Sequence, residues 1–110
     1  MSASTPRINA AMVAAHANQR VLLMCQVLQA HGNQAKVLCT DRAEVTVHLA
    51  PGEQTLVLHA MYELLCRVDH GGVLHEESRL ALNPEFDLDG MNDVIKLAQT
   101  PELKPLFTHA

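Results

Sequence analysis

Metal binding is the first chemistry to consider, because imidazole and thiolate groups are common zinc ligands and the chain has seven histidines and three cysteines. The nearest approach to a ligand set is the combination of Cys66, His70 and His75. No C-x-x-C, H-x-H or H-x-x-x-H spacing places two such side chains on one face of a helix or strand. We therefore expect surface and hairpin histidines, with no bound metal and no other cofactor.

Catalytic chemistry has equally little support in the residue pattern. The sequence contains no G-x-S-x-G nucleophile elbow and no glycine-rich phosphate-binding loop. Glu76 and Glu77 are adjacent carboxylates, and we interpret them as part of a solvated turn instead of an acid–base pair. The sequence therefore predicts that the protein is not an enzyme.

Strong nucleic-acid binding would require basic and aromatic side chains gathered on one surface. The formal net charge is −4, and the aromatic residues are one tyrosine and two phenylalanines. We expect Tyr62 to point inward. Most basic side chains are scattered singly among acids and are interpreted as solvated charges on sheet faces; they are Arg20, Lys36, Arg42, Arg67 and Arg79. Lys36 and Arg42, near a predicted turn between strands, are the candidates for weak DNA contact.

The cysteines and the chain's start indicate the cellular environment. Cys25, Cys39 and Cys66 are well separated and lie in apolar, strand-like runs, so we expect reduced core thiols and a reducing compartment. The opening residues MSASTPR lack the apolar run of a signal peptide, and no stretch reaches the roughly 18 apolar residues that span a membrane. We expect a soluble intracellular protein with no membrane partner.

The clearest structural element is an amphipathic helix over residues 86–99. At about 100° per residue its apolar side chains fall along one arc of roughly 180°; they are Leu88, Met91, Val94, Ile95, Leu97 and Ala98. Asp87 or Asp89 can cap its first N–H groups, and Thr100-Pro101 ends it. So wide an arc predicts that one part covers the domain and another part meets a second chain. A helix packed only on its own core is the alternative.

Five strands are expected from runs of alternating or continuous apolar residues, over 20–30, 35–41, 43–50, 61–69 and 73–83. The first is long and begins buried before it curves outward. The second and third should be antiparallel neighbours, because their connection is short. In the fourth, we expect four side chains to point inward: Tyr62, Leu64, Cys66 and Val68. Leu80 and Leu82 share one face of the fifth.

Residues 10–17 are predicted to form a short N-terminal helix, with Asn9 as its N-cap. Five short strands and a terminal helix in one domain fit a small closed β-barrel better than an open sheet, whose edges would need protection. The fold class is all-β, a five-stranded oligonucleotide/oligosaccharide-binding (OB) barrel. We divide the chain into a flexible tail over 1–7, the barrel over 8–84, and an oligomerisation helix with its tail over 85–110.

Three short motifs resemble the smallest subunit of eukaryotic replication protein A. They occur in matching order and at matching distances, and the similarity covers residues 6–107. The motifs are Pro6-Arg7-Ile8-Asn9-Ala10, then Glu63-Leu64-Leu65-Cys66-Arg67-Val68, then Phe86-Asp87-Leu88 opening a helix that ends near a Pro-Leu-Phe. The chain departs from the family at Cys25 and Cys66, where glycine is common and barrel strands bend sharply.

The resemblance implies a single OB barrel whose C-terminal helix joins helices of the middle and large subunits in a three-helix bundle. The heterotrimer would bind single-stranded DNA in replication, repair and recombination, in the nucleus. The expected subunit interface is Leu88, Met91, Val94, Ile95, Leu97, Ala98 and Phe107, with Met91 and Ile95 inserted between partner helices. Single-stranded DNA would be bound mainly through the complex. Two alternatives stay open: the small OB subunit of a telomere-capping trimer, and a free-standing single-stranded nucleic-acid-binding module.

Overall fold

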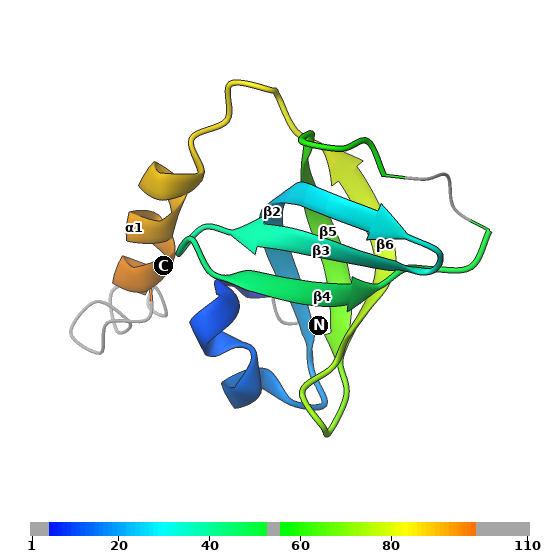
Figure 1. Ribbon diagram of the computed structural model, residues 1–110. Helices are drawn as coiled ribbons and strands as arrows, with labels where there is room; N and C mark the ends of the chain where they lie inside the picture. Colours follow the sequence, from blue (N-terminus) through cyan, green and yellow to red (C-terminus); the bar gives the residue numbers. More distant parts are fainter. Residues whose placement is uncertain (1–4, 53–55, 99–110) are drawn as a thin grey trace.

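Residues 5–52 and 56–98 of the protein are described by a computed structural model, in which a ring of strands lies beside a single α-helix (Figure 1). Two short 3-10 turns precede the longest strand. The elements are β1 (Arg7–Ile8), η1 (Ala10–Met12), η2 (Ala14–His16), β2 (Arg20–His31), β3 (Gln34–Cys39), β4 (Glu44–His48), β5 (Met61–Val68), β6 (Leu74–Ala81) and α1 (Leu88–Ala98).

The sheet closes on itself. Its strand order is β1-β2-β3-β4-β6-β5, and β5 also pairs with β2, so that five strands form a ring. Neighbouring strands are antiparallel except at two places, where β1 joins β2 and where β4 joins β6. The short β1 lies parallel along β2 and extends the sheet beyond the ring. The predicted OB fold with five principal strands is therefore confirmed.

Period-two alternation explains which side chains fill the ring, because successive residues of a strand point to opposite faces. All four residues of β5 predicted to point inward are buried, and Arg67 of the same strand is exposed. The interior is aliphatic and includes Ile8, Val21, Leu23, Val27, Val37, Val47 and Leu74.

Two register shifts bend the strands where a flat sheet could not close. One lies in β2, where Leu28 is the extra residue between Val27 and Gln29, and the other lies in β6, where Glu77 is the extra residue opposite Leu65 and Cys66 of β5. Cys66 therefore pairs beside the second shift, and Cys25 lies two residues before the first. The β2–β3 connection is tight, and Gly32 takes a φ of 62° there, which glycine adopts at little cost.

The N-terminal region differs from the prediction in two ways. Residues 10–16 form two 3-10 turns instead of an α-helix, and the Asn9 side chain makes no cap hydrogen bond to them. Asn9 does occupy the N-cap position of η1, but its side chain does not cap: Nδ2 donates to Asn92 in the helix, and Oδ1, the atom that a cap would use, has no hydrogen-bond partner within the described residues. The sheet also begins at Arg7, one residue earlier than the expected barrel boundary.

Two side chains of β6 also differ from the simplest reading of the sequence. Glu76 is only 5% exposed, so its interpretation as part of a solvated turn was wrong. Leu80 is 62% exposed and stands outside the core, whereas Leu82 lies beyond the end of the strand and is half-buried. The extra residue Glu77 explains both cases, because it reverses the alternation of β6: Leu74 and Glu76 before it are buried, whereas Leu80 after it is exposed.

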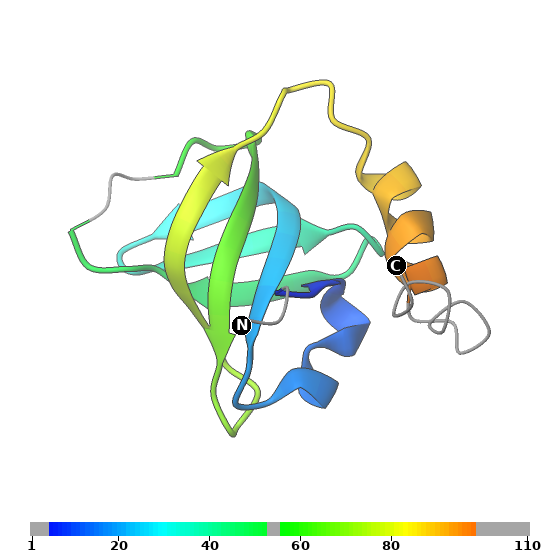
Figure 2. The same ribbon diagram turned by 180° about the vertical axis from the view of Figure 1, so that it is seen from behind.

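The helix is reached through a strap over residues 82–87 that crosses one end of the ring (Figures 1 and 2). Asp87 caps the helix as predicted, because its Oδ1 accepts a hydrogen bond from the Gly90 N–H at 3.0 Å. The expected helix end at Thr100-Pro101 and the interface candidate Phe107 lie outside the described residues. None of the helices in the described ranges is long and apolar enough to span a bilayer.

Candidate functional site

Helix α1 stands beside the ring and presents a different mixture of side chains on each face (Figures 1 and 2). Leu88 and Ile95 are buried, with exposed fractions of 9% and 2%. Val94 and Leu97 are 57% and 55% exposed, and Ala98 is also exposed. The helix therefore keeps apolar side chains in solvent after its own buried face is covered.

Helical geometry explains why apolar surface is left over. At about 100° per residue, the buried direction of Leu88 and Ile95 lies at one end of the apolar arc, not at its centre. Ala98 and Val94 follow at increasing angles, and Leu97 lies at the opposite end. The sequence predicted that the arc would be divided between this chain and another. In the structure the buried part of the arc ends at Met91, which is half-buried, and the apolar side chains beyond it are exposed.

Burial also separates Met91 and Ile95, which we expected to act as adjacent knobs between partner helices. Ile95 is already buried within this chain, and Met91 is half-buried. The large exposed apolar side chains of the arc are Val94 and Leu97 instead. The sequence could not show this, because an apolar arc indicates how much of the helix surface is apolar but not which part of that surface faces the barrel.

A polar side chain inside the buried face holds the helix. Asn92 lies between Leu88 and Ile95 on the same side of α1, and its Oδ1 accepts two hydrogen bonds. One comes from Asn9 Nδ2 at 2.9 Å and the other from Thr40 Oγ1 at 3.0 Å. Asn9 and Thr40 are themselves buried. Sequence reasoning placed Asn92 on the solvent face, although its spacing of four after Leu88 and three before Ile95 was a signal for this contact.

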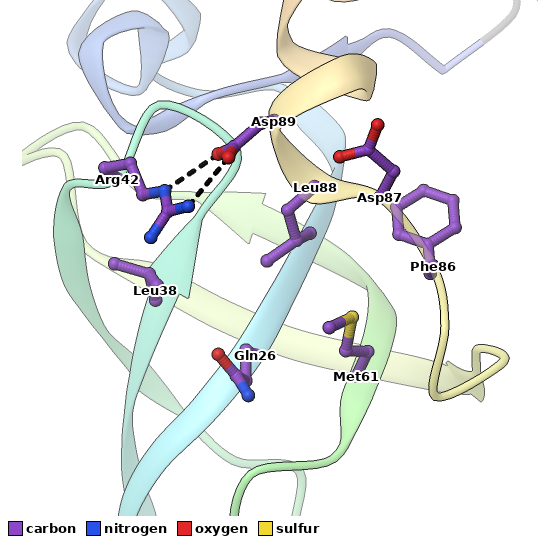
Figure 3. A pocket seen from close by; sticks show the side chains of 8 residues that line it. All are labelled: Gln26, Leu38, Arg42, Met61, Phe86, Asp87, Leu88 and Asp89. Atoms are coloured by element: carbon purple, nitrogen blue, oxygen red, sulfur yellow. Dashed lines mark hydrogen bonds and ion pairs between the residues drawn. The ribbon is translucent and has the colours of Figure 1, made fainter.

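An ion pair forms the second polar contact of the helix. The Arg42 guanidinium donates two hydrogen bonds to the Asp89 carboxylate, from Nε at 2.8 Å and from Nη2 at 2.7 Å (Figure 3). This hydrogen bonding lowers the pKa of Asp89 and raises the pKa of Arg42. Arg42 has a φ of 66°, a left-handed conformation that is uncommon for residues other than glycine.

The same loop between β3 and β4 also anchors the N-terminal turns. The Asp41 carboxylate accepts hydrogen bonds from the backbone N–H groups of Ala10 and Ala11, at 3.3 and 3.1 Å. Residues 40–42 therefore connect the start of the chain, the barrel and the C-terminal helix.

A shallow groove of about 210 Å³ separates the start of the helix from the barrel wall (Figure 3). Its walls combine apolar and charged side chains, namely Gln26, Leu38, Arg42, Met61, Phe86, Asp87, Leu88 and Asp89. The guanidinium of Arg42 is directed to the Asp89 carboxylate, and the remaining charged group is a second carboxylate, on Asp87. The groove offers an anionic ligand little attraction.

The two candidates for weak DNA contact both have carboxylate neighbours. Arg42 is bound to Asp89, and Lys36 Nζ lies 3.8 Å from Glu44 Oε1 in an exposed pair. Three further arginines also form ion pairs, Arg7 with Glu63, Arg20 with Glu77 and Arg79 with Glu76. The positive charge of these side chains is therefore largely balanced within the chain. DNA contact at Lys36 or Arg42 stays a prediction.

The histidines and cysteines lie in separate environments. His75 Nε2 donates to Asp69 Oδ2 at 2.9 Å, whereas Cys66 is buried inside the ring. Burial raises the pKa of Cys39 and of Cys66 to about 12 and that of Cys25 well above its usual value, which keeps the three thiols protonated. Within the described part of the chain, no group of three His, Cys, Asp or Glu side chains could hold a metal ion.

Solved structures with the same arrangement of strands and helix come from two kinds of complex. The chain is similar to a chain of U. maydis replication protein A bound to single-stranded DNA, with a TM-score of 0.80 and 19% identity over 97% of this chain and 98% of that chain. For yeast replication protein A bound to single-stranded DNA the TM-score is 0.73, with 16% identity over 94% and 99%.

The telomere capping protein Ten1 from Saccharomyces pombe is also similar, with a TM-score of 0.71 and 11% identity over 87% of this chain and 98% of that chain. At such low identities these similarities show the fold alone. No curated protein sequence matches the chain. Residues 1–106 match the sequence profile of the family described as replication factor A protein 3. Because that match extends over nearly the whole chain, the protein belongs to the replication factor A protein 3 family.

Proposed function

We propose that this protein is a non-catalytic scaffold subunit of a heterotrimeric single-stranded DNA-binding complex of the replication protein A type. The observation that carries the proposal is the exposure of Val94 and Leu97 on a helix that is already docked on its own barrel. Exposed apolar side chains in a row on one helix are typical of a surface that another helix covers. The partners would be helices of the middle and large subunits, which would form a three-helix bundle with α1.

Family membership and structural similarity support the cellular role in this proposal. Two of the similar structures are of replication protein A bound to single-stranded DNA. By analogy, the complex would act in DNA replication, repair and recombination in the nucleus, and DNA would be bound mainly by other subunits. The carboxylate partners of Lys36 and Arg42 favour this division of roles.

A telomere-capping trimer is the second candidate, because the chain also resembles the telomere capping protein Ten1. Both complexes would use the same fold in a small subunit, so the fold does not distinguish them. The identity of the middle subunit does. Affinity purification of the tagged full chain from native extract, followed by identification of the co-purifying chains, separates the two candidates.

The assembly surface is tested by the double variant Val94→Asp with Leu97→Asp. Burial of each apolar side chain is worth about 1.5–3 kcal/mol, so loss of both should weaken assembly by at least about 3 kcal/mol, or roughly a hundredfold. The measurement is co-purification with the middle subunit together with circular dichroism of the variant. Loss of the partner with an unchanged β-sheet signal is the expected result.

The matched control is Val57→Asp with Leu80→Asp, which places two carboxylates at side chains that are each 62% exposed on the barrel. This control should assemble like the unmodified chain. An intact complex containing the Val94→Asp, Leu97→Asp chain would contradict the proposed assembly surface. Loss of assembly in the control as well would show that added negative charge, and not the helix face, is responsible.

A further inference from the structure

Two polar side chains, Asp89 and Asn92, attach α1 to the rest of the molecule. They are three residues apart, so they project from the same side of the helix. Asp89 binds Arg42, and Asn92 accepts hydrogen bonds from Asn9 and Thr40. We call these five residues, Asn9, Thr40, Arg42, Asp89 and Asn92, the clasp.

The clasp is more directional than apolar packing. A hydrogen bond weakens steeply when its angle or length changes, whereas apolar contacts tolerate sliding and rotation. Asn92 lies one turn after Leu88 at the border of the buried face, and its two donors come from segments far apart in the sequence. Rotation of α1 about its axis would break both hydrogen bonds and the Arg42–Asp89 pair together.

The inner end of the clasp is built into the fold. Asn9 and Thr40 are 4% and 1% exposed, which leaves their side chains little freedom to follow a moving helix. Arg42 reaches Asp89 from a backbone with positive φ, and the adjacent Asp41 binds the N-terminal turns. The loop therefore offers the helix a seat that is also held by contacts outside the helix.

This seat determines which side of the helix is left in solvent. With Asn92 in place, Leu88 and Ile95 are buried, and Val94 and Leu97 are exposed. The apolar arc alone could be buried in several rotational settings, because it covers about half of the helix circumference. The clasp selects one of these settings.

We propose that the clasp is a positioning device for subunit assembly, in which Arg42 and Asn92 hold α1 in the rotation that presents Val94 and Leu97 to partner helices. This inference rests on the proposed function. The clasp residues act without contacting the partner. Ordering the helix before the partner arrives removes an entropic cost of binding, so the clasp raises the affinity of assembly.

The first test uses Asn92→Ala, which leaves the Asn9 amide and the Thr40 hydroxyl without this acceptor. In the free chain, hydrogen exchange of the α1 amides should become at least about tenfold faster, while the β2 amides stay protected. In the complex, affinity for the co-expressed middle and large subunits should fall by about tenfold. Circular dichroism of the variant checks that the β-sheet is retained.

The second test is a charge exchange. Arg42→Asp alone places two carboxylates opposite each other and should weaken assembly by about fivefold or more. Arg42→Asp combined with Asp89→Arg restores an opposite-charge pair and should recover most of that loss. A residue with a merely structural role in the loop would not be rescued by a change in the helix.

Three outcomes would overturn the inference. Assembly affinity could stay within twofold of the unmodified chain although helix exchange accelerates, which would show that rotation is not limiting. Affinity could rise, which would make the clasp an inhibitory contact. The charge exchange could also fail to rescue Arg42→Asp. Failure of the proposed function looks different, because the Val94→Asp, Leu97→Asp chain would then assemble normally whatever the clasp variants do.

Discussion

Glu76 shows at the scale of one residue how the ring is closed. Its carboxylate accepts hydrogen bonds from the Ala50 backbone N–H at 3.1 Å and from Arg79 Nε at 2.6 Å, and its side chain is fully buried. Ala50 follows β4, and Glu76 and Arg79 both lie in β6, so the bond from Ala50 crosses the seam where β4 and β6 share only two residue pairs, while Arg79 neutralises the carboxylate within β6. A buried carboxylate with such partners contributes to closing the ring.

We expect Glu76→Ala to destabilise the protein strongly. The change removes a buried acceptor from Arg79 and from the Ala50 N–H, and breaking a buried ion pair costs about 3 kcal/mol or more. The control is Glu77→Ala, since Glu77 pairs with Arg20 on the surface and should contribute no more than about 1 kcal/mol. Urea denaturation followed by circular dichroism measures both. Equal effects of the two variants would contradict a role for Glu76 in the seam.

Asp69 supports a pH-dependent contribution to stability. Its Oδ2 accepts from His75 Nε2, and its Oδ1 accepts from the backbone N–H groups of Val73 and Gly71. The hydrogen bond from His75 and those from the backbone lower the pKa of Asp69 from 3.8 to about 2. Because the folded pKa is the lower one, the contribution is complete above pH 3.8 and disappears as the pH falls through about 2.

Asp69→Asn should therefore lower the melting temperature at pH 7, with a difference that shrinks below pH 3.8 and vanishes near pH 2. Thermal denaturation of both proteins over a pH series provides the measurement. Glu85→Gln, which removes a carboxylate from an exposed position in the strap, is the control for net charge. A melting difference that is independent of pH would show that the amide change alone, and not ionisation, is responsible.

At the scale of elements, the start of α1 combines a side-chain cap at Asp87 with a glycine, Gly90, in the first turn of the helix. Asp87 caps the helix through its bond from the Gly90 N–H. A side chain at position 90 would crowd Asp87, because a Cβ there would come too close to the Asp87 Oδ2 atom. Glycine at this position therefore leaves room for the Asp87 carboxylate in its capping position, although glycine in a helix costs about 1 kcal/mol relative to alanine.

This relationship predicts that substitutions at the two positions are not additive. Gly90→Ala alone should change helix stability little, since the gain in helix propensity is offset by displacement of the cap, while Asp87→Ala alone should cost about 1 kcal/mol. In the Asp87→Ala background, Gly90→Ala should stabilise the helix by up to about 1 kcal/mol. Native-state hydrogen exchange of the α1 amides measures these differences. Additive effects would show that the carboxylate moves aside without cost.

The whole molecule consists of a closed ring with its charges balanced internally and one helix held at its side. Basic side chains on several faces have carboxylate partners, and the described aromatic residues are Tyr62, whose hydroxyl accepts the Val57 N–H, and Phe86 beside the helix. Stacking of bases on aromatic rings within a basic groove is the usual source of single-strand affinity. The described surface provides little aromatic area for stacking and little unbalanced positive charge.

The isolated chain should therefore bind single-stranded oligonucleotides no more tightly than about 10⁻⁴ M at physiological salt. Fluorescence anisotropy of a labelled oligonucleotide over a salt series measures this affinity. Lys36→Ala is the matched variant, and a lower affinity for it would locate the residual contact at β3. Submicromolar binding that persists at about 0.2 M salt would favour a free-standing nucleic-acid-binding module instead of a scaffold subunit.

Local sequence patterns were sufficient to predict the five strands of the ring, the helix α1 and the fold class. The alternation in β5, the turn at Gly32 and the Asp87 cap each depend on residues that are neighbours along the chain or across one turn. The closed ring followed because five short strands leave edges that only closure removes. These features could be predicted because their energetics are local or depend only on the number and order of strands.

Tertiary structure alone decided how the helix is seated and which side chains of it remain free. The partners of Asp89 and Asn92 lie 47, 52 and 83 residues away in the sequence, so periodicity within the helix carries no information about them. The same holds for Glu76, whose burial follows from the meeting of β6 with the end of β4. Hydrogen bonds between distant segments set the rotation of an element, whereas the hydrophobic pattern sets only which rotations bury apolar surface.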